Sequence, residues 1–168
     1  MDELTQRADA AAVAAGQALL AHGLTLATAE SCTGGLIGHL VTQVSGSSAY
    51  YLGGVIAYAN SVKEGLLGVS PCDLETHGAV SAPVALQMAR GACAATGAQV
   101  GIAVTGIAGP LGGTPTKPVG TVYIGLATPQ GNEVLHRVWQ SDREGNKWLT
   151  AAAALELVVA HLEASASE

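Results

Sequence analysis

Three residues in the first half of the chain could together cleave a bond by acid–base and nucleophilic chemistry: Ser31, Tyr58 and Lys63. A serine hydroxyl becomes a nucleophile when a base removes its proton, and an uncharged lysine amine can be that base in place of histidine. Lys63 is one of only two cations between Ser31 and Thr116. A lysine in so apolar a stretch is expected to be partly buried, and lost hydration lowers the pKa of an amine. Lowering that pKa from about 10.4 to near 7 requires the surroundings to destabilise the charged amine, relative to the uncharged one, by about 4 to 5 kcal/mol.

Each of these residues also has a simpler interpretation. A serine before a glycine-rich turn is often a helix N-cap, and a strand tyrosine often packs its ring. Lys63 could equally be a solvated helix lysine that pairs with Glu64 or with a phosphate. Cys32 follows Ser31 and could itself be the nucleophile. Because neighbours in an extended segment point to opposite sides, we expect only one of these two to face the site. The three residues together favour hydrolysis.

Other catalytic patterns fit less well. Short-chain dehydrogenases place tyrosine and lysine four residues apart, whereas Tyr58 and Lys63 are five apart, about 140° out of line on a helix. No Gly-x-Gly-x-x-Gly follows the first predicted strand, which disfavours nicotinamide-dependent hydride transfer. None of the histidines stands in a recognisable triad motif, and we expect surface or packing roles for His22, His39, His77, His136 and His161.

A second candidate region is the glycine- and proline-rich loop that follows Thr105 and ends near Lys117. Closely spaced glycines let backbone N–H groups converge on an anion, to which the two side chains could add donors. The spacing fits a phosphate-binding loop and a purely structural turn equally well. Gly34 and Gly35 could instead expose backbone donors to a tetrahedral oxyanion.

The elements that must position these residues alternate along the chain. Apolar periodicity and capping residues predict helices over 2–22, from 33 onward, from an Asn60 cap to 67, from a Ser81 cap to about 97, and over 143–165. Strands are expected over 24–29, 54–58 and 99–105, followed by a hairpin of 119–128 and 133–140. We therefore expect an α/β fold, a mixed β-sheet flanked by helices on both faces, in a single compact domain over 1–168.

Composition narrows the class of function further. A net charge of −6 without a basic run disfavours nucleic-acid binding. No uncharged stretch reads as a membrane span and the start of the chain lacks a secretion signal, so we expect a cytoplasmic protein. Three cysteines without CxxC spacing, Cys32, Cys72 and Cys93, favour neither disulfides nor a zinc site.

Five segments in order carry a resemblance to a known family: 28–35 (TAESCTGG), 54–69, 77–81 (HGAVS), 105–110 (TGIAGP) and 117–122 (KPVGTV). They closely resemble the CinA C-terminal domain family, also called PncC-type nicotinamide-nucleotide amidohydrolases. The resemblance implies hydrolysis of nicotinamide mononucleotide to nicotinate mononucleotide and ammonia, a step of pyridine-nucleotide salvage. It implies no metal or organic cofactor, a homodimer, Ser31 as nucleophile, and Tyr58 and Lys63 as proton-handling partners.

The resemblance also implies a set of substrate-binding residues, with the phosphate on backbone donors of the 105–109 loop. The set is Thr33, Gly34, Gly35, Ser48, Asn60, Thr105, Gly106, Gly109, Lys117 and Arg143. The family pattern leads us to expect a second arginine near position 147, where this chain has Lys147. Two alternatives remain: a non-catalytic nucleotide-binding or regulatory module on the same fold, and an amidase acting on a different carboxamide.

Overall fold

A five-stranded sheet runs through the computed structural model, which describes residues 2–167, in the order β2-β1-β3-β4-β5. Three strands are parallel, β1 (Leu26–Glu30), β2 (Tyr51–Ile56) and β3 (Val100–Gly106). The hairpin of β4 (Thr121–Thr128) and β5 (Gly131–Val138) continues the sheet in antiparallel fashion. This mixed sheet confirms the predicted architecture.

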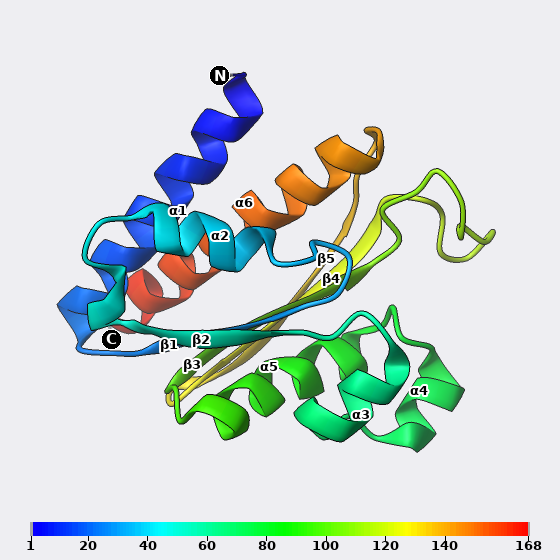
Figure 1. Cartoon of the computed structure of the whole chain (residues 1–168), viewed down its shortest axis with the longest axis horizontal. Helices are drawn as coiled ribbons and strands as arrows, with labels where there is room; N and C mark the ends of the chain where they lie inside the picture. Colours follow the sequence, from blue (N-terminus) through cyan, green and yellow to red (C-terminus); the bar gives the residue numbers. More distant parts are fainter. Residues whose placement is uncertain (1, 168) are drawn as a thin grey trace.

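Helices cover both faces of the sheet, as Figure 1 shows with the sheet seen nearly edge-on. One layer contains α1 (Glu3–His22), α2 (Leu36–Gln43) and α6 (Arg143–Ser165). The other contains α3 (Asn60–Leu67), α4 (Pro71–His77) and α5 (Ala82–Thr96). The predicted helical layers on the two faces are confirmed.

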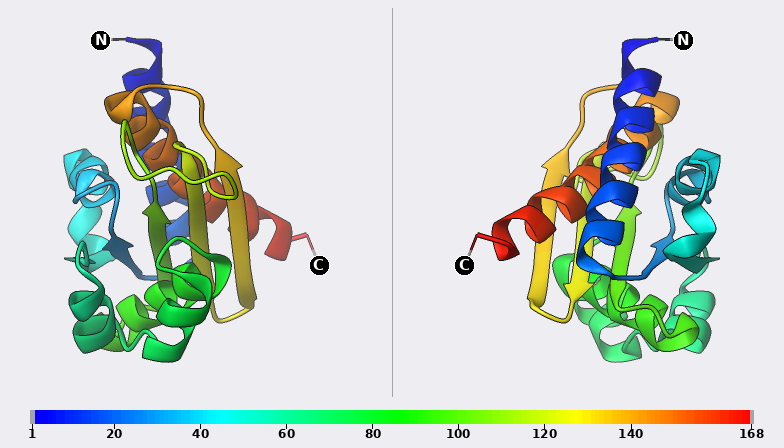
Figure 2. Two further views of the ribbon diagram at one scale, coloured as in Figure 1. Left: turned by 90° about the vertical axis from the view of Figure 1, so that its right-hand side faces the viewer. Right: turned by 90° about the vertical axis from the view of Figure 1, so that its left-hand side faces the viewer.

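Small side chains let the helices of the first layer approach one another closely. Helix α1 buries Ala8, Ala11, Ala12 and Ala15, and α6 buries the run Ala151 to Ala154. Figure 2 shows these two helices crossing over the sheet. With no phenylalanine in the chain, close approach of backbones replaces large rings as the way to fill the core.

Helix α6 is the one helix within residues 2–167 long and apolar enough, by length and composition, to cross a membrane. Half of its most apolar window is buried inside the molecule. Its buried side chains belong to the same core as those of α1 and the sheet, which accounts for the apolar composition.

Several predicted boundaries are wrong by a few residues. The strand predicted over 54–58 is β2, which ends at Ile56, so Tyr58 lies beyond it. Helix α2 begins at Leu36 and not at 33, because Gly34 and Gly35 adopt positive φ angles of 62° and 101° and form a turn. Ser31 therefore lies before a turn, not at a helix N-terminus.

One predicted cap is wrong, because Asn60 is the first residue of α3 and its cap is Ala59. Ser81 is the N-cap residue of α5, as predicted, although its hydroxyl donates to the carbonyl of Gly78 and accepts no bond from the helix. Helix α4 was not expected, although Ser70 caps it and Pro71 opens it in the manner typical of helix starts.

Candidate active site

A cavity of about 210 Å³ opens where the parallel strands β1, β2 and β3 end. The carboxyl ends of parallel strands share one edge of a sheet, and ligands commonly bind there. Seven of the lining residues are Ser31, Cys32, Tyr58, Asn60, Lys63, Thr105 and Arg143. The fold thus brings the three predicted catalytic residues to one cavity.

Lys63 reaches the cavity from the first turn of α3. Its side-chain nitrogen lies 3.1 Å from the hydroxyl oxygen of Ser31 and 3.2 Å from the backbone carbonyl oxygen of Tyr58. The side chain is only 1% exposed, and no acidic group of residues 2–167 forms an ion pair with it. Burial therefore lowers the pKa of the amine. A desolvated amine beside a hydroxyl can act as its base.

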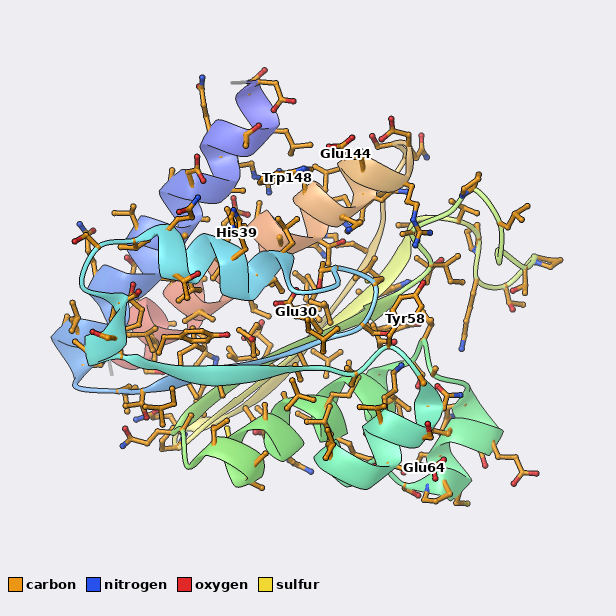
Figure 3. All side chains as sticks on the ribbon, viewed as in Figure 1. Glu30, His39, Tyr58, Glu64, Glu144 and Trp148 are labelled. Carbon is orange, nitrogen blue, oxygen red and sulfur yellow. The ribbon has the colours of Figure 1, made fainter. Side chains whose placement is uncertain are left out.

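Tyr58 lies at the rim of the cavity, where the chain leaves β2 (Figure 3). Its side chain is 65% exposed, and the phenol oxygen accepts a hydrogen bond of 3.4 Å from Arg143. Its backbone carbonyl, not its phenol, contacts the lysine. The phenol is thus positioned beside the Ser31–Lys63 pair and not between its members.

Cys32 lines the cavity as Ser31 does, so the expectation that only one of them faces it is wrong. The chain is already leaving the strand here, because Ser31 begins a turn closed by the N–H of Gly34. The Cys32 side chain nevertheless belongs to the apolar core, and burial raises the pKa of its thiol to about 12. A thiol of that pKa is protonated at neutral pH, which leaves Ser31 as the nucleophile candidate.

The buried carboxylate of Glu30 holds the turn that carries Ser31. Its Oε2 atom accepts from the Thr33 hydroxyl at 2.6 Å and from the N–H groups of Gly35 and Ile37 at 3.1 and 3.0 Å. Its Oε1 atom accepts from the N–H of Gly38 at 2.8 Å. Figure 3 shows Glu30 beneath α2. Glu30 was not among the predicted site residues, although an acidic residue in an apolar strand before a glycine turn is a usable signal.

These contacts change the expected roles of the glycine turn. The N–H of Gly34 donates to the Ser31 carbonyl, and the N–H of Gly35 donates to Glu30, so neither is free to hold an oxyanion. Thr33 is likewise committed to Glu30 through its hydroxyl. The N–H groups of Cys32 and Thr33, which follow Ser31 directly, make no hydrogen bond to another part of the described chain.

The loop after β3 is hydrogen-bonded to the first residues of α6. Arg143 donates to the carbonyl of Gly109 at 2.6 Å, and the buried Asn146 donates to the carbonyl of Ala108 at 3.0 Å. The N–H of Ile107 donates to Thr121. The loop therefore directs two carbonyl oxygens at donors and uses the N–H of Ile107 within the fold. Phosphate binding by its other N–H groups stays a prediction.

The remaining predicted residues divide between the cavity and other places. Gly106 lines the cavity, as do Asn60 and Thr105, whose hydroxyl donates to the carbonyl of Ala79. Lys117 does not line it, because its side-chain nitrogen donates to the carbonyl of His77 at 2.6 Å. Ser48 is exposed in a short 3-10 helix, Ser47–Ala49, before β2 and so at the opposite end of the parallel strands. The single chain does not bring Ser48 or Lys117 to the site.

The family model and the curated relatives that match this chain all belong to CinA or competence-damage inducible proteins. The model of the CinA C-terminal domain matches residues 8–162. A CinA-like protein of Salinibacter ruber is 56% identical over 141 residues, which cover 84% of this chain and 34% of that protein. A putative competence-damage inducible protein of Moorella thermoacetica is 49% identical over 149 residues, covering 89% and 36%. The chain spans about a third of the length of these curated relatives.

Solved structures show the same fold over nearly the whole chain. The competence/damage inducible protein CihA of Agrobacterium tumefaciens superposes with a TM-score of 0.87 at 41% identity, covering 94% of this chain and 96% of that one. A competence-damaged protein (CinA) superfamily protein of Escherichia coli gives a TM-score of 0.88 at 33% identity, covering 95% and 92%.

Proposed function

This chain belongs to the CinA C-terminal domain family, and we propose that it is an amidohydrolase that deamidates nicotinamide mononucleotide to nicotinate mononucleotide and ammonia. The observation that carries the proposal is the 3.1 Å contact between the Lys63 amine and the Ser31 hydroxyl in a buried setting. Such a pair suits nucleophilic attack on an amide, because burial keeps the amine uncharged and therefore able to accept the hydroxyl proton.

The first step is attack of the Ser31 oxygen on the carboxamide carbon, while uncharged Lys63 accepts the hydroxyl proton. The N–H groups of Cys32 and Thr33 are the nearest backbone donors in sequence and are suited to the resulting oxyanion. In this proposal they bind the oxyanion in place of the backbone donors of Gly34 and Gly35, which were predicted from the sequence.

The second step breaks the carbon–nitrogen bond. The amide nitrogen takes up one proton and leaves as ammonia, while an ester remains on Ser31. Tyr58 is suited to deliver that proton, because its phenol lies at the cavity rim with Arg143 as a fixed partner. Lys63 then gives the proton that it took from Ser31 to the phenolate of Tyr58, which restores the phenol and returns the amine to its uncharged form.

The third step is hydrolysis of the ester. Lys63 removes a proton from water, the hydroxide attacks the acyl carbon, and the Ser31 oxygen leaves with the proton returned by the lysine. The product is nicotinate mononucleotide, and the enzyme regains its starting protonation.

The test is ammonia release by purified protein from nicotinamide mononucleotide. We expect turnover in the wild type and a loss of at least about 10³-fold in Ser31→Ala, as for removal of other hydrolase nucleophiles. Absence of turnover with this substrate but turnover with another carboxamide would identify an amidase of different specificity. Binding of the nucleotide without any turnover would favour the non-catalytic module.

A further inference from the structure

The short segment that joins α4 to α5 forms one side of the candidate active-site cavity, because its residues Ala79 and Val80 line that cavity. We call residues 77–81 the 77–81 wall. The first residue of the wall ends α4, and the next four belong to no helix or strand before α5 begins. The position of the wall therefore depends on hydrogen bonds that other parts of the chain make to its backbone.

Three successive backbone carbonyls of the 77–81 wall each accept a hydrogen bond from a side chain. The donor and acceptor residues are Lys117 and His77 at 2.6 Å, Ser81 and Gly78 at 2.8 Å, and Thr105 and Ala79 at 2.8 Å. Lys117 is the charged donor of the three, and hydrogen bonds from charged donors are stronger than those between neutral groups. Its bond joins positions 40 residues apart and is therefore a tertiary contact.

The loop after β3 presents Lys117 to the wall from a closed turn. The N–H of Thr114 donates to the Lys117 carbonyl at 2.8 Å, and the N–H of Lys117 donates to the Thr114 hydroxyl at 3.0 Å. The same loop is bonded to α6 through the carbonyls of Ala108 and Gly109. Figure 1 shows this loop, in yellow-green, at the end of the sheet between the layers of α6 and α4. Lys117 thus connects the wall to a loop that the opposite layer of helices holds in place.

The contacts of Lys117 differ from those of the catalytic pair. Lys117 does not line the cavity, and no ion pair among residues 2–167 includes it. Ser31 and Lys63 follow β1 and β2, and the hydrogen bonds of the Lys63 amine do not involve the 77–81 wall. Displacement of the wall should therefore change how the cavity receives a substrate without changing the activation of Ser31.

We propose that Lys117 is a positioning residue, which holds the 77–81 wall against the candidate active site through its bond to the His77 carbonyl. The inference rests on the proposed amidohydrolase function for its substrate, and it replaces the direct contact with substrate that was expected of Lys117. Arginine at this position can still donate to the carbonyl, whereas methionine fills similar space and donates nothing. These two substitutions separate the hydrogen bond from the bulk of the side chain.

The kinetic experiment measures ammonia release from nicotinamide mononucleotide. In Lys117→Met we expect KM to rise about tenfold while kcat stays within about twofold of the wild-type value, which is the pattern of lost ground-state binding. Lys117→Arg should keep the wild-type KM. Arg90→Met, which removes an exposed cation from α5, is the matched control and should also keep it. An unchanged KM in Lys117→Met overturns the proposal, as does a fall in kcat at constant KM.

Amide hydrogen exchange of the ligand-free chain separates this inference from the proposed reaction. The N–H groups of Gly78 and Ala85 close hydrogen bonds at the two ends of the 77–81 wall. In Lys117→Met both should exchange about tenfold faster, while the N–H groups of α6 keep their wild-type rates. That result supports the positioning role even if the wild type releases no ammonia. Unchanged exchange at both groups, which is expected if Lys117 contacts only substrate, overturns the proposal, and so does an equal increase along the whole chain.

Discussion

The side-chain nitrogen of Lys63 lies 3.1 Å from the hydroxyl oxygen of Ser31, although 32 positions separate the two residues in the chain. Ser31 follows β1 and Lys63 lies in α3, which follows the neighbouring strand β2. The parallel pairing of β1 with β2 brings both connections to the same edge of the sheet. The chemistry proposed for this chain depends on this pair.

Replacing Lys63 tests whether the amine acts as a base. Lys63→Ala should lower kcat by about 10² to 10⁴-fold, the usual contribution of general acid–base catalysis. Lys63→Arg keeps a cation but cannot lose its proton near neutral pH, so we expect a similar loss. Steady-state ammonia release measures both. Near-normal turnover in Lys63→Arg would mean that only the positive charge is needed.

The pH dependence of activity and stability should follow the lowered pKa of Lys63. Activity requires the uncharged amine, so kcat/KM should rise as pH increases through that pKa. Between the folded-state pKa and the usual value of 10.5, the unfolded chain binds more protons than the folded one. The free energy of unfolding should therefore rise with pH across this interval.

Lys63→Met should show which part of that slope belongs to the lysine. The variant has no proton to bind at this position, so its unfolding free energy in urea should rise less steeply over the same interval. Met also removes a buried charge below the folded-state pKa, where the wild type bears the cost of burying it. Identical slopes in the two proteins would contradict a lowered pKa.

Glu30→Gln tests whether the buried carboxylate positions the turn that carries Ser31. The amide group keeps the size of the side chain but presents an NH₂ group to donors that now find oxygen. We expect a loss of about 2 kcal/mol in unfolding free energy. Displacement of the nucleophile should also lower kcat by up to about 10²-fold.

Thr28→Val is the matched control for Glu30→Gln. Thr28 precedes Glu30 by two residues in β1, is equally buried, and bonds to the phenol of Tyr51 instead of the turn. It should lose about 1 kcal/mol of stability and keep the wild-type kcat at temperatures where both proteins are folded. If kcat falls in proportion to stability in both variants, Glu30 has no positioning role.

Tyr58→Phe distinguishes two roles for the phenol. The phenol contacts Arg143 and not Ser31, so we assign it to protonation of the leaving group and not to activation of the serine. Its removal should therefore lower kcat for amide hydrolysis by about 10² to 10⁴-fold. The rate at which a fluorophosphonate labels Ser31 should stay at the wild-type value, because that reaction needs only the Ser31–Lys63 pair. Slower labelling would place the phenol within the activation of the serine.

The expected homodimer can be tested at the β2 edge of the sheet. Among residues 2–167, β2 has a neighbouring strand on one side only, and its Leu52 and Ile56 side chains are 48% and 57% exposed. We expect a dimer that uses this edge, since unpaired apolar edge strands favour association. Ile56→Lys should then shift the mass measured by light scattering toward the monomer. A wild-type monomer, or a dimer insensitive to this change, would contradict the prediction.

The sequence by itself determined the α/β architecture and the burial of Lys63. Apolar periodicity and capping residues report which face of an element is buried, and the fold class follows from the alternation of such elements. The burial of Lys63 was likewise predicted from local sequence, because few charged residues surround it. The structure confirms that its side chain is almost fully buried.

Only the tertiary structure decided which groups these residues contact. Glu30 is an acidic residue beside a serine in the sequence, and its four donors become visible only when the turn folds back over β1. Lys117, Ser48 and Arg143 were all predicted to bind substrate. In the structure the side-chain nitrogen of Lys117 donates to the His77 carbonyl instead. Ser48 lies before β2, at the opposite end of the parallel strands from the cavity. Periodicity encodes burial within one element, whereas the partners of a polar group depend on how distant elements pack together.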